Sequence, residues 1–87
     1  MLYIILVYDI DKSRVGKANR FLKAYIMWIQ NSVFEGEISD GTFERMMKKF
    51  GKLIKDRDSV IVYKFRAKSY FEKQIVGVEK GSTDNVI

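Results

Sequence analysis

Cysteine, histidine and proline are absent from this sequence of 87 residues. Without cysteine, the chain cannot form a disulfide scaffold, use a thiolate nucleophile or bind zinc or an iron–sulfur cluster through sulfur. Without histidine, it cannot build a Ser-His-Asp triad, a histidine general base or a histidine-rich metal site. Any catalysis must therefore use carboxylates, lysine, tyrosine, serine, backbone groups or a metal ion bound by oxygen atoms.

Long apolar runs are also absent, since no segment approaches the roughly 20 apolar residues that span a bilayer. The N-terminal run MLYIILVYDI has no basic region before it and no small-residue cleavage site, which indicates a buried strand rather than a signal peptide. We therefore expect a cytoplasmic protein that binds no membrane. Because no proline-rich or low-complexity linker interrupts the chain, we expect one domain over residues 1–87, with a core over about 1–65.

Charge is distributed unevenly along the chain, whose formal net charge is +5. No acidic residue occurs between Lys12 and Phe34, and the basic residues of that segment are Lys12, Arg14, Lys17, Arg20 and Lys23. The segment is either a solvated helix face with few acids or a surface that binds a polyanion, and charge alone leaves both readings open. A second group, Lys48, Lys49, Lys52 and Lys55, lies on the polar side of a predicted helix, where a solvated face is the favoured interpretation.

Periodicity predicts a strand over Leu2–Asp9 with apolar residues on both faces, and a helix over Ser13–Ile26 capped by Asp11 or Ser13. Residues 28–38 are expected to be extended, with a bend or bulge at Gly36. A second helix is expected to begin at Ser39 or Asp40, followed by a strand over Asp58–Phe65 and a short last strand over Gln74–Val78.

This order of elements favours an α+β protein. If the extended region supplies two strands, the order is that of a ferredoxin-like βαββαβ plait, in which both helices cover one face of the sheet. The first strand is apolar on both faces, yet the chain has no further element to cover the second face. We therefore expect a homodimer that packs through the open sheet faces.

Asp9 ends the first strand beside the basic segment, where a hard cation such as Mg²⁺ could bind together with substrate phosphate. Magnesium keeps several waters and needs only one or two protein carboxylates. Alternatively, Asp9 only starts a turn, as strand-terminal aspartates commonly do.

Three stretches together resemble the CRISPR-associated protein 2 family: LVYDI at residues 6–10, the basic helix from Arg14 to Tyr25, and IQNSVFEGEI at residues 29–38. The resemblance spans about residues 1–65. It implies a ferredoxin-like homodimer in the CRISPR adaptation module, which partners an integrase during spacer acquisition. It also implies that the C-terminal segment, about 66–87, packs as a short strand on the partner subunit.

The same resemblance implies roles for individual residues. The metal-binding and catalytic aspartate of the family falls on Asp9, with Mg²⁺ or Mn²⁺ as the cofactor, and Tyr8 precedes it. Ser32 and Phe34 match a motif that supports the site. The start of the family's basic helix falls on Arg14 and Lys17, and with Lys12 and Arg20 of the same basic segment and Tyr8 these are the residues expected to bind nucleic acid. The chain departs from the family at Ile26, where a glycine is common, which affects the exit of the first helix.

Three functions are consistent with these features. The first is a metal-dependent endonuclease that cleaves RNA or DNA at a pair of Asp9 side chains on a dimer axis. The second is a non-catalytic scaffold that binds the nucleic-acid backbone and bridges integrase dimers. The third is a toxin-like ribonuclease of similar fold outside CRISPR adaptation. The sequence does not distinguish RNA from DNA as substrate.

Overall fold

The computed structural model describes residues 1–66 and 72–81. It contains four strands and two α-helices, with short 3₁₀ turns at Lys12–Arg14 and Gly51–Leu53. The order along the chain is β1 (Leu2–Asp9), α1 (Val15–Lys23), β2 (Met27–Gln30), β3 (Val33–Ile38), α2 (Asp40–Phe50) and β4 (Ser59–Phe65). No helix in this described part of the chain is long and apolar enough to cross a membrane.

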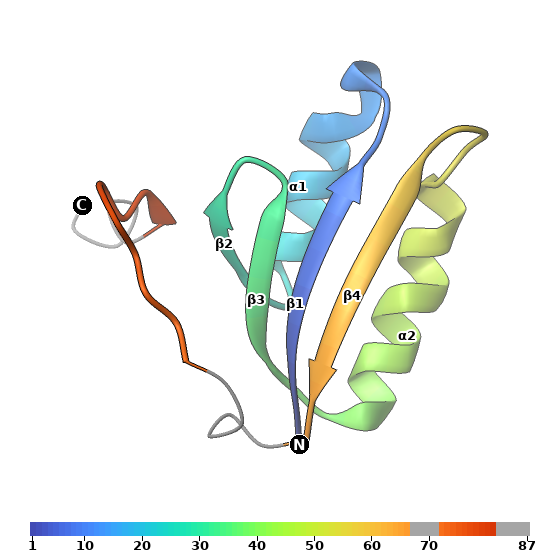
Figure 1. The fold of residues 1–87 in the computed structure, drawn as a ribbon. Helices are drawn as coiled ribbons and strands as arrows, with labels where there is room; N and C mark the ends of the chain where they lie inside the picture. The colour runs from blue at the N-terminus through green and yellow to red at the C-terminus, as the bar shows by residue number, and fades with distance from the viewer. Residues whose placement is uncertain (67–71, 82–87) are drawn as a thin grey trace.

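The four strands form one sheet in the order β2-β3-β1-β4, and all neighbouring strands are antiparallel. Both helices lie behind the sheet in Figure 1, so one face is covered and the other is open. The α+β, ferredoxin-like fold predicted from the sequence is confirmed.

β1 is the central strand and its side chains alternate between the two faces. Leu2, Ile4 and Leu6 are almost fully buried beneath the helices, where they meet the apolar stripe of α2 at Phe43, Met46 and Phe50. Tyr3, Ile5, Val7 and Asp9 lie on the open face, because a strand turns successive side chains to opposite sides. This alternation places Asp9 at the end of the open face.

Helix α2 begins as the sequence predicts. Ser39 is its N-cap, and the Ser39 hydroxyl accepts a hydrogen bond from the Thr42 backbone N–H at 3.2 Å. Asp40 lies in the first turn, where the helix dipole favours negative charge.

Helix α1 differs from its predicted range of Ser13–Ile26. The 3₁₀ turn at Lys12–Arg14 precedes it, and the helix ends at Lys23. The chain leaves the helix early because Ile26 turns inward: it is 7% exposed and packs against Gly36. Gly36 itself lies in a regular ladder opposite Ile4, so the bend expected there is wrong.

The extended region divides at residues 31 and 32. Asn31 adopts a left-handed backbone conformation with φ of 47°, which asparagine tolerates, and the chain reverses there into β3. The irregular pairing of β2 lies between Trp28 and Gln30 rather than at Gly36.

The short strand predicted over Gln74–Val78 is not formed within this chain. The stretch 72–81 runs beside β2 in Figure 1. It is held by an ion pair from Lys73 Nζ to Glu35 Oε2 at 3.0 Å and by the close approach of Gly81 to the Trp28 carbonyl, where a Cβ would lie only 2.4 Å away. The rest of the C-terminal segment that was expected to pack on a partner, 67–71 and 82–87, lies outside the described residues.

Candidate functional site at the end of strand β1

Asp9 lies at the last position of β1, directly opposite Ser59 at the first position of β4. Its side chain is exposed, and within residues 1–66 and 72–81 its carboxylate makes no hydrogen bond or ion pair. An exposed carboxylate without a protein partner can bind a cation or a proton donor from outside the chain. Asp9 is therefore available for the role that the sequence predicts.

Tyr8 points to the opposite side of the sheet. It is 4% exposed, and its hydroxyl donates a hydrogen bond to Asn19 Oδ1 on α1. Burial raises the pKa of the Tyr8 hydroxyl. Tyr8 therefore ties β1 to α1 beneath the site, and its direct contact with nucleic acid stays a prediction.

Ser32 and Phe34 lie next to Tyr8, as their predicted supporting role requires. The Ser32 carbonyl accepts a hydrogen bond from the Tyr8 backbone N–H at 3.2 Å. The Phe34 ring is fully buried and stacks on the Tyr8 ring, with centroids 6.2 Å apart. Both residues therefore hold the end of β1 in place, Ser32 through its backbone carbonyl and Phe34 through its buried ring.

The predicted basic residues separate into two groups. Lys12, Lys17 and Arg20 are exposed on the turn and helix that follow Asp9. Arg14 is only 22% exposed at its side chain, and its guanidinium is paired with Asp58 and hydrogen-bonded to the Leu53 carbonyl at 3.1 Å. Among the residues that the structure describes, Lys12, Lys17 and Arg20 make no ion pair with an acid, whereas Arg14 is occupied by Asp58.

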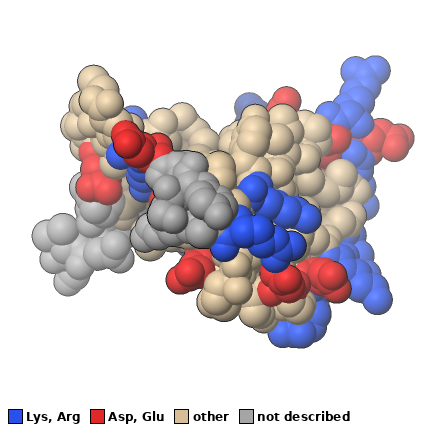
Figure 2. Space-filling model, turned by 60° about the horizontal axis from the view of Figure 1, so that its bottom comes forward, with Lys and Arg blue, Asp and Glu red and all other residues tan. Residues whose placement is uncertain are grey.

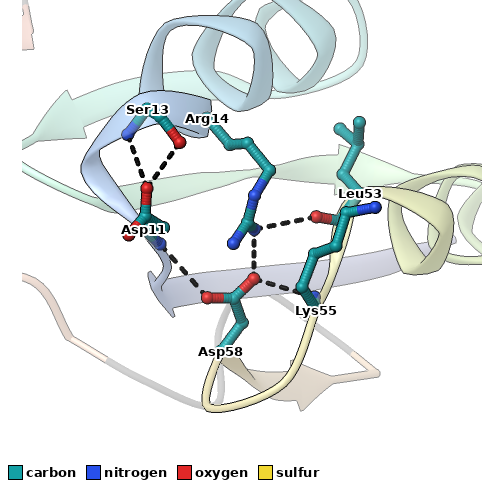
Figure 3. A network of polar contacts seen from close by, with 6 residues as sticks. All are labelled: Asp11, Ser13, Arg14, Leu53, Lys55 and Asp58. Carbon is teal, nitrogen blue, oxygen red and sulfur yellow. Dashed lines mark hydrogen bonds and ion pairs between the residues drawn. The ribbon is translucent and has the colours of Figure 1, made fainter.

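Asp58 organises the loops around the site, and the sequence analysis missed it. One of its oxygens accepts the Asp11 backbone N–H at 3.1 Å, and the other accepts the Lys55 backbone N–H at 2.8 Å and binds Arg14. Figure 3 shows how these contacts tie the loop after β1 to the loop before β4. The hydrogen bond from Arg14 holds the pKa of Asp58 below its ordinary value.

Asp11 is also occupied. Its carboxylate accepts the Ser13 backbone N–H at 3.0 Å and the Ser13 hydroxyl, which lowers the pKa of Asp11. Asp11 and Asp58 are thus both engaged by the protein, whereas Asp9 at the end of β1 and the exposed Asp56 in the loop before β4 have no polar partner among the described residues.

Asn19 and Glu35 were also missed. Asn19 shares the inner side of α1 with Val15, Ala18 and Leu22, because these positions follow helical spacing; a polar residue in such a stripe indicates a buried partner. Glu35 is 8% exposed on β3, and it accepts the Tyr3 hydroxyl at 2.6 Å as well as Lys73. No local signal in the sequence joins Tyr3, Glu35 and Lys73.

The residues at this end of the sheet can be tested against the metal ion that the sequence predicts. Among the described residues, no three acidic side chains come together as a ligand set. One free carboxylate suits Mg²⁺, which binds through one or two carboxylates and keeps its waters. The residues therefore fit this ion if a second Asp9 from another copy completes the site.

A pocket of about 630 Å³ lies elsewhere, between the end of α1 and β2. Its lining includes Lys23, Tyr25, Trp28 and Gly81, and none of the predicted site residues. It therefore does not belong to the site at Asp9.

Comparison with known proteins shows what this arrangement resembles. Residues 1–73 match the family model described as CRISPR associated protein Cas2. The chain is 44% identical to the "CRISPR-associated endoribonuclease Cas2" of Thermococcus kodakarensis, covering 99% of this chain and 100% of the relative. It is 42% identical to the protein of the same name from Methanocaldococcus jannaschii, covering 99% of this chain and 76% of the relative. A structure described as "Crystal structure of cas2" superposes with a TM-score of 0.84 at 39% identity, covering 91% of this chain and 90% of the other.

Proposed function

The chain belongs to the CRISPR-associated Cas2 family, and we propose that it is a CRISPR adaptation protein that binds nucleic acid and cleaves phosphodiester bonds. The observation that carries this proposal is the exposed Asp9 at the end of β1, whose carboxylate has no partner in the described part of the chain and which is followed along the chain by the exposed cations Lys12, Lys17 and Arg20. The names of the relatives, which describe them as endoribonucleases, support RNA as one substrate. DNA remains a second substrate within the proposal.

The active form in this proposal is a homodimer packed through the open sheet faces. Ile61 and Tyr63 on β4 are 51% and 53% exposed there, next to Ile5 and Val7 of β1. An apolar patch of this kind marks a protein interface. A two-fold axis on this face brings the two Asp9 carboxylates toward each other, which supplies the second ligand that one chain lacks.

Asp9 from each protomer would hold Mg²⁺ or Mn²⁺. Such an ion, when bound, supplies Lewis-acid stabilisation of charge on the phosphate and activates water for hydrolysis. Two carboxylates held close together repel one another and so favour a cation between them. Tyr8, Ser32 and Phe34 keep β1 in place beneath the pair, through the contacts described above.

Lys12, Lys17 and Arg20 would hold the phosphate backbone on either side of the scissile bond. Contacts to phosphate carry no base information, so binding should be electrostatic and indifferent to sequence. Arg14 contributes less to this surface, since Asp58 neutralises it. An integrase is the protein partner that membership of the adaptation module implies.

The Asp9→Asn variant tests the catalytic part of the proposal. It keeps the size of the side chain and removes its charge, so metal-dependent cleavage should fall by at least about 100-fold, since even outer partners of metal ligands are worth 10- to 100-fold. The measurement is cleavage of single-stranded RNA and duplex DNA across a Mg²⁺ and Mn²⁺ series. Asp56→Asn, an exposed aspartate in the loop before β4, is the matched control and should cleave like the wild type.

Cleavage by Asp9→Asn at the wild-type rate would remove Asp9 from the reaction. One observation favours a second candidate, the non-catalytic scaffold: among the described residues, no three acidic side chains come together as a ligand set. The scaffold function is favoured if neither the wild type nor Asp9→Asn cleaves with either metal, while both proteins bind duplex DNA together with an integrase.

A further inference from the structure

Helix α2 carries a second group of cations that the proposed site does not use. Its members are spaced as i, i+3, i+4 and i+7, so they lie on one side of the helix and its 3₁₀ continuation. That side is opposite the buried stripe of Phe43, Met46 and Phe50, and every member is exposed. We call this group the α2 basic row: Arg45, Lys48, Lys49 and Lys52.

No acid among the described residues forms an ion pair with this row. The ion pairs in the described part of the chain join Arg14 to Asp58, Arg66 to Asp40 and Lys73 to Glu35, so none includes a member of the row. Its only side-chain hydrogen bond there runs from Arg45 to the Thr42 hydroxyl. Between Gly41 and Lys55 the sequence has one acid, Glu44. Adjacent like charges on a helix repel, so the row favours an external anion.

The row lies on the helix side of the molecule, away from the open sheet face. Lysine and arginine side chains line the right-hand margin of Figure 2, the side on which α2 lies in Figure 1. Helix α1, with Lys17 and Arg20, belongs to the same layer. A dimer formed through the open faces therefore leaves both helices of each protomer accessible.

The surface chemistry distinguishes a nucleic acid from an acidic protein as the occupant. Protein interfaces need buried aromatic or apolar anchors, and lysine is depleted from their cores. None of the large exposed apolar side chains in the described residues lies on α2 or in the loop that follows it. A phosphate backbone requires no apolar anchor, because lysine and arginine bind it by charge alone.

We propose that the α2 basic row is a second phosphate-binding surface, which holds the nucleic-acid backbone away from Asp9 while α1 holds it near the site. The inference rests on the proposed function, because it assumes that the protein binds nucleic acid. Lys48 and Lys49 also stabilise the negative end of the helix dipole, as residues of the last turn. Arg45, one turn earlier, lies outside that effect, so the dipole does not account for the row.

The test compares salt dependence of binding between variants of the full chain. The double variant Lys48→Gln/Lys52→Gln should bind a defined DNA duplex with a log–log salt slope shallower by about 0.9 for each lysine, or twice that if both protomers contact the duplex. Lys48→Arg/Lys52→Arg keeps the charge and should keep the wild-type slope. Arg66→Gln removes a cation that is already paired with Asp40 and should change the slope little.

A parallel variant on α1, Lys17→Gln/Arg20→Gln, separates the inference from the proposed function. If the α1 variant changes the slope and the α2 variant does not, the inference is overturned and the proposed function stands; the row then suits an acidic protein surface. If neither variant changes the salt slope, both the inference and the proposed nucleic-acid binding are contradicted. Thermal melting of each variant shows whether a shallower slope comes with lost folding, and a normal slope in the arginine variant rules out a purely structural effect.

Discussion

Asp58 and Asp9 lie at the same end of the sheet, but their carboxylates have opposite surroundings. Asp58 uses both oxygens within the protein, with its side chain only 4% exposed, whereas Asp9 has no polar partner among the described residues. The Arg14 contact spans 44 positions of sequence and the Asp11 contact spans 47. A strand-flanking aspartate gives no local signal of such partners, so sequence reasoning could place Asp9 but assigned Arg14 to phosphate and overlooked Asp58.

The Asp58 ion pair predicts a specific dependence of stability on pH. Because the folded protein holds the Asp58 pKa below its ordinary 3.8, chiefly through the Arg14 hydrogen bond, the pair stabilises the fold above that pH. This contribution is lost as the pH falls through the folded-state pKa. Asp58→Asn should therefore lower the melting temperature at pH 7, and the gap to wild type should narrow below about pH 4.

Thermal melts from pH 7 to pH 3 measure this gap, with Asp56→Asn as the control. Asparagine keeps an oxygen that can accept the Asp11 N–H, so the difference reports mainly the charge. A gap that stays constant over the whole range would show that the Arg14 pair contributes nothing to stability.

At the scale of elements, the contact between Ile26 and Gly36 explains the early end of α1. A Cβ on Gly36 would lie 3.0 Å from Ile26 Cγ2 and 3.4 Å from Ile26 Cα, so the two residues fit only as a pair. The sequence marked Ile26 as a departure from the family pattern and Gly36 as a bend. It could not show that they touch, because the contact joins the end of a helix to the middle of a strand.

This contact predicts a coupled pair of substitutions. Gly36→Ala should reduce the free energy of unfolding by about 1–3 kcal/mol, the usual cost of overpacking, because Ile26 has little room to move. In an Ile26→Ala background, the same change should cost less, since the 3.0 Å contact with Cγ2 is gone and only the 3.2 Å approach to the Cβ remains, while alanine suits a strand better than glycine. Urea unfolding of the four proteins measures the coupling, expected at about 0.5–3 kcal/mol. Equal effects in the two backgrounds would show that Gly36 is required for another reason.

The whole molecule has two layers, a sheet and the pair of helices that covers one of its faces. Because the central strand is apolar on both faces, we expect a third layer over the open face. β1 is apolar on both faces, which made the ferredoxin-like plait and its open face predictable from the sequence. Strand boundaries for β1 and β4 agree with their predicted ranges to within one residue, since alternating apolar residues define both. The C-terminal strand was not predictable in the same way: Gln74–Val78 carries exposed apolar side chains but forms no strand with the described residues of its own chain, so its packing on a second copy stays a prediction.

The expected dimer gives the last prediction. Ile61 on β4 lies directly beside Val7 on β1, on the open face of the sheet, and is half exposed. A dimer through this face would bury Ile61, and the core of the single chain does not depend on this side chain. Ile61→Lys should place a lysine near its symmetry mate in a desolvated interface and weaken the dimer by at least about tenfold. In sedimentation at micromolar concentration, wild type should run at twice the chain mass and the variant should shift toward the monomer.

Glu44→Gln, on the exposed side of α2, changes the net charge by the same single unit and should leave the dimer intact. Loss of the dimer should also separate the two Asp9 side chains, so metal-dependent cleavage should fall with the dimer fraction across a dilution series of the variant. A variant that stays dimeric would place the interface on another surface. A dimer that dissociates without loss of cleavage would show that one Asp9 suffices for the reaction.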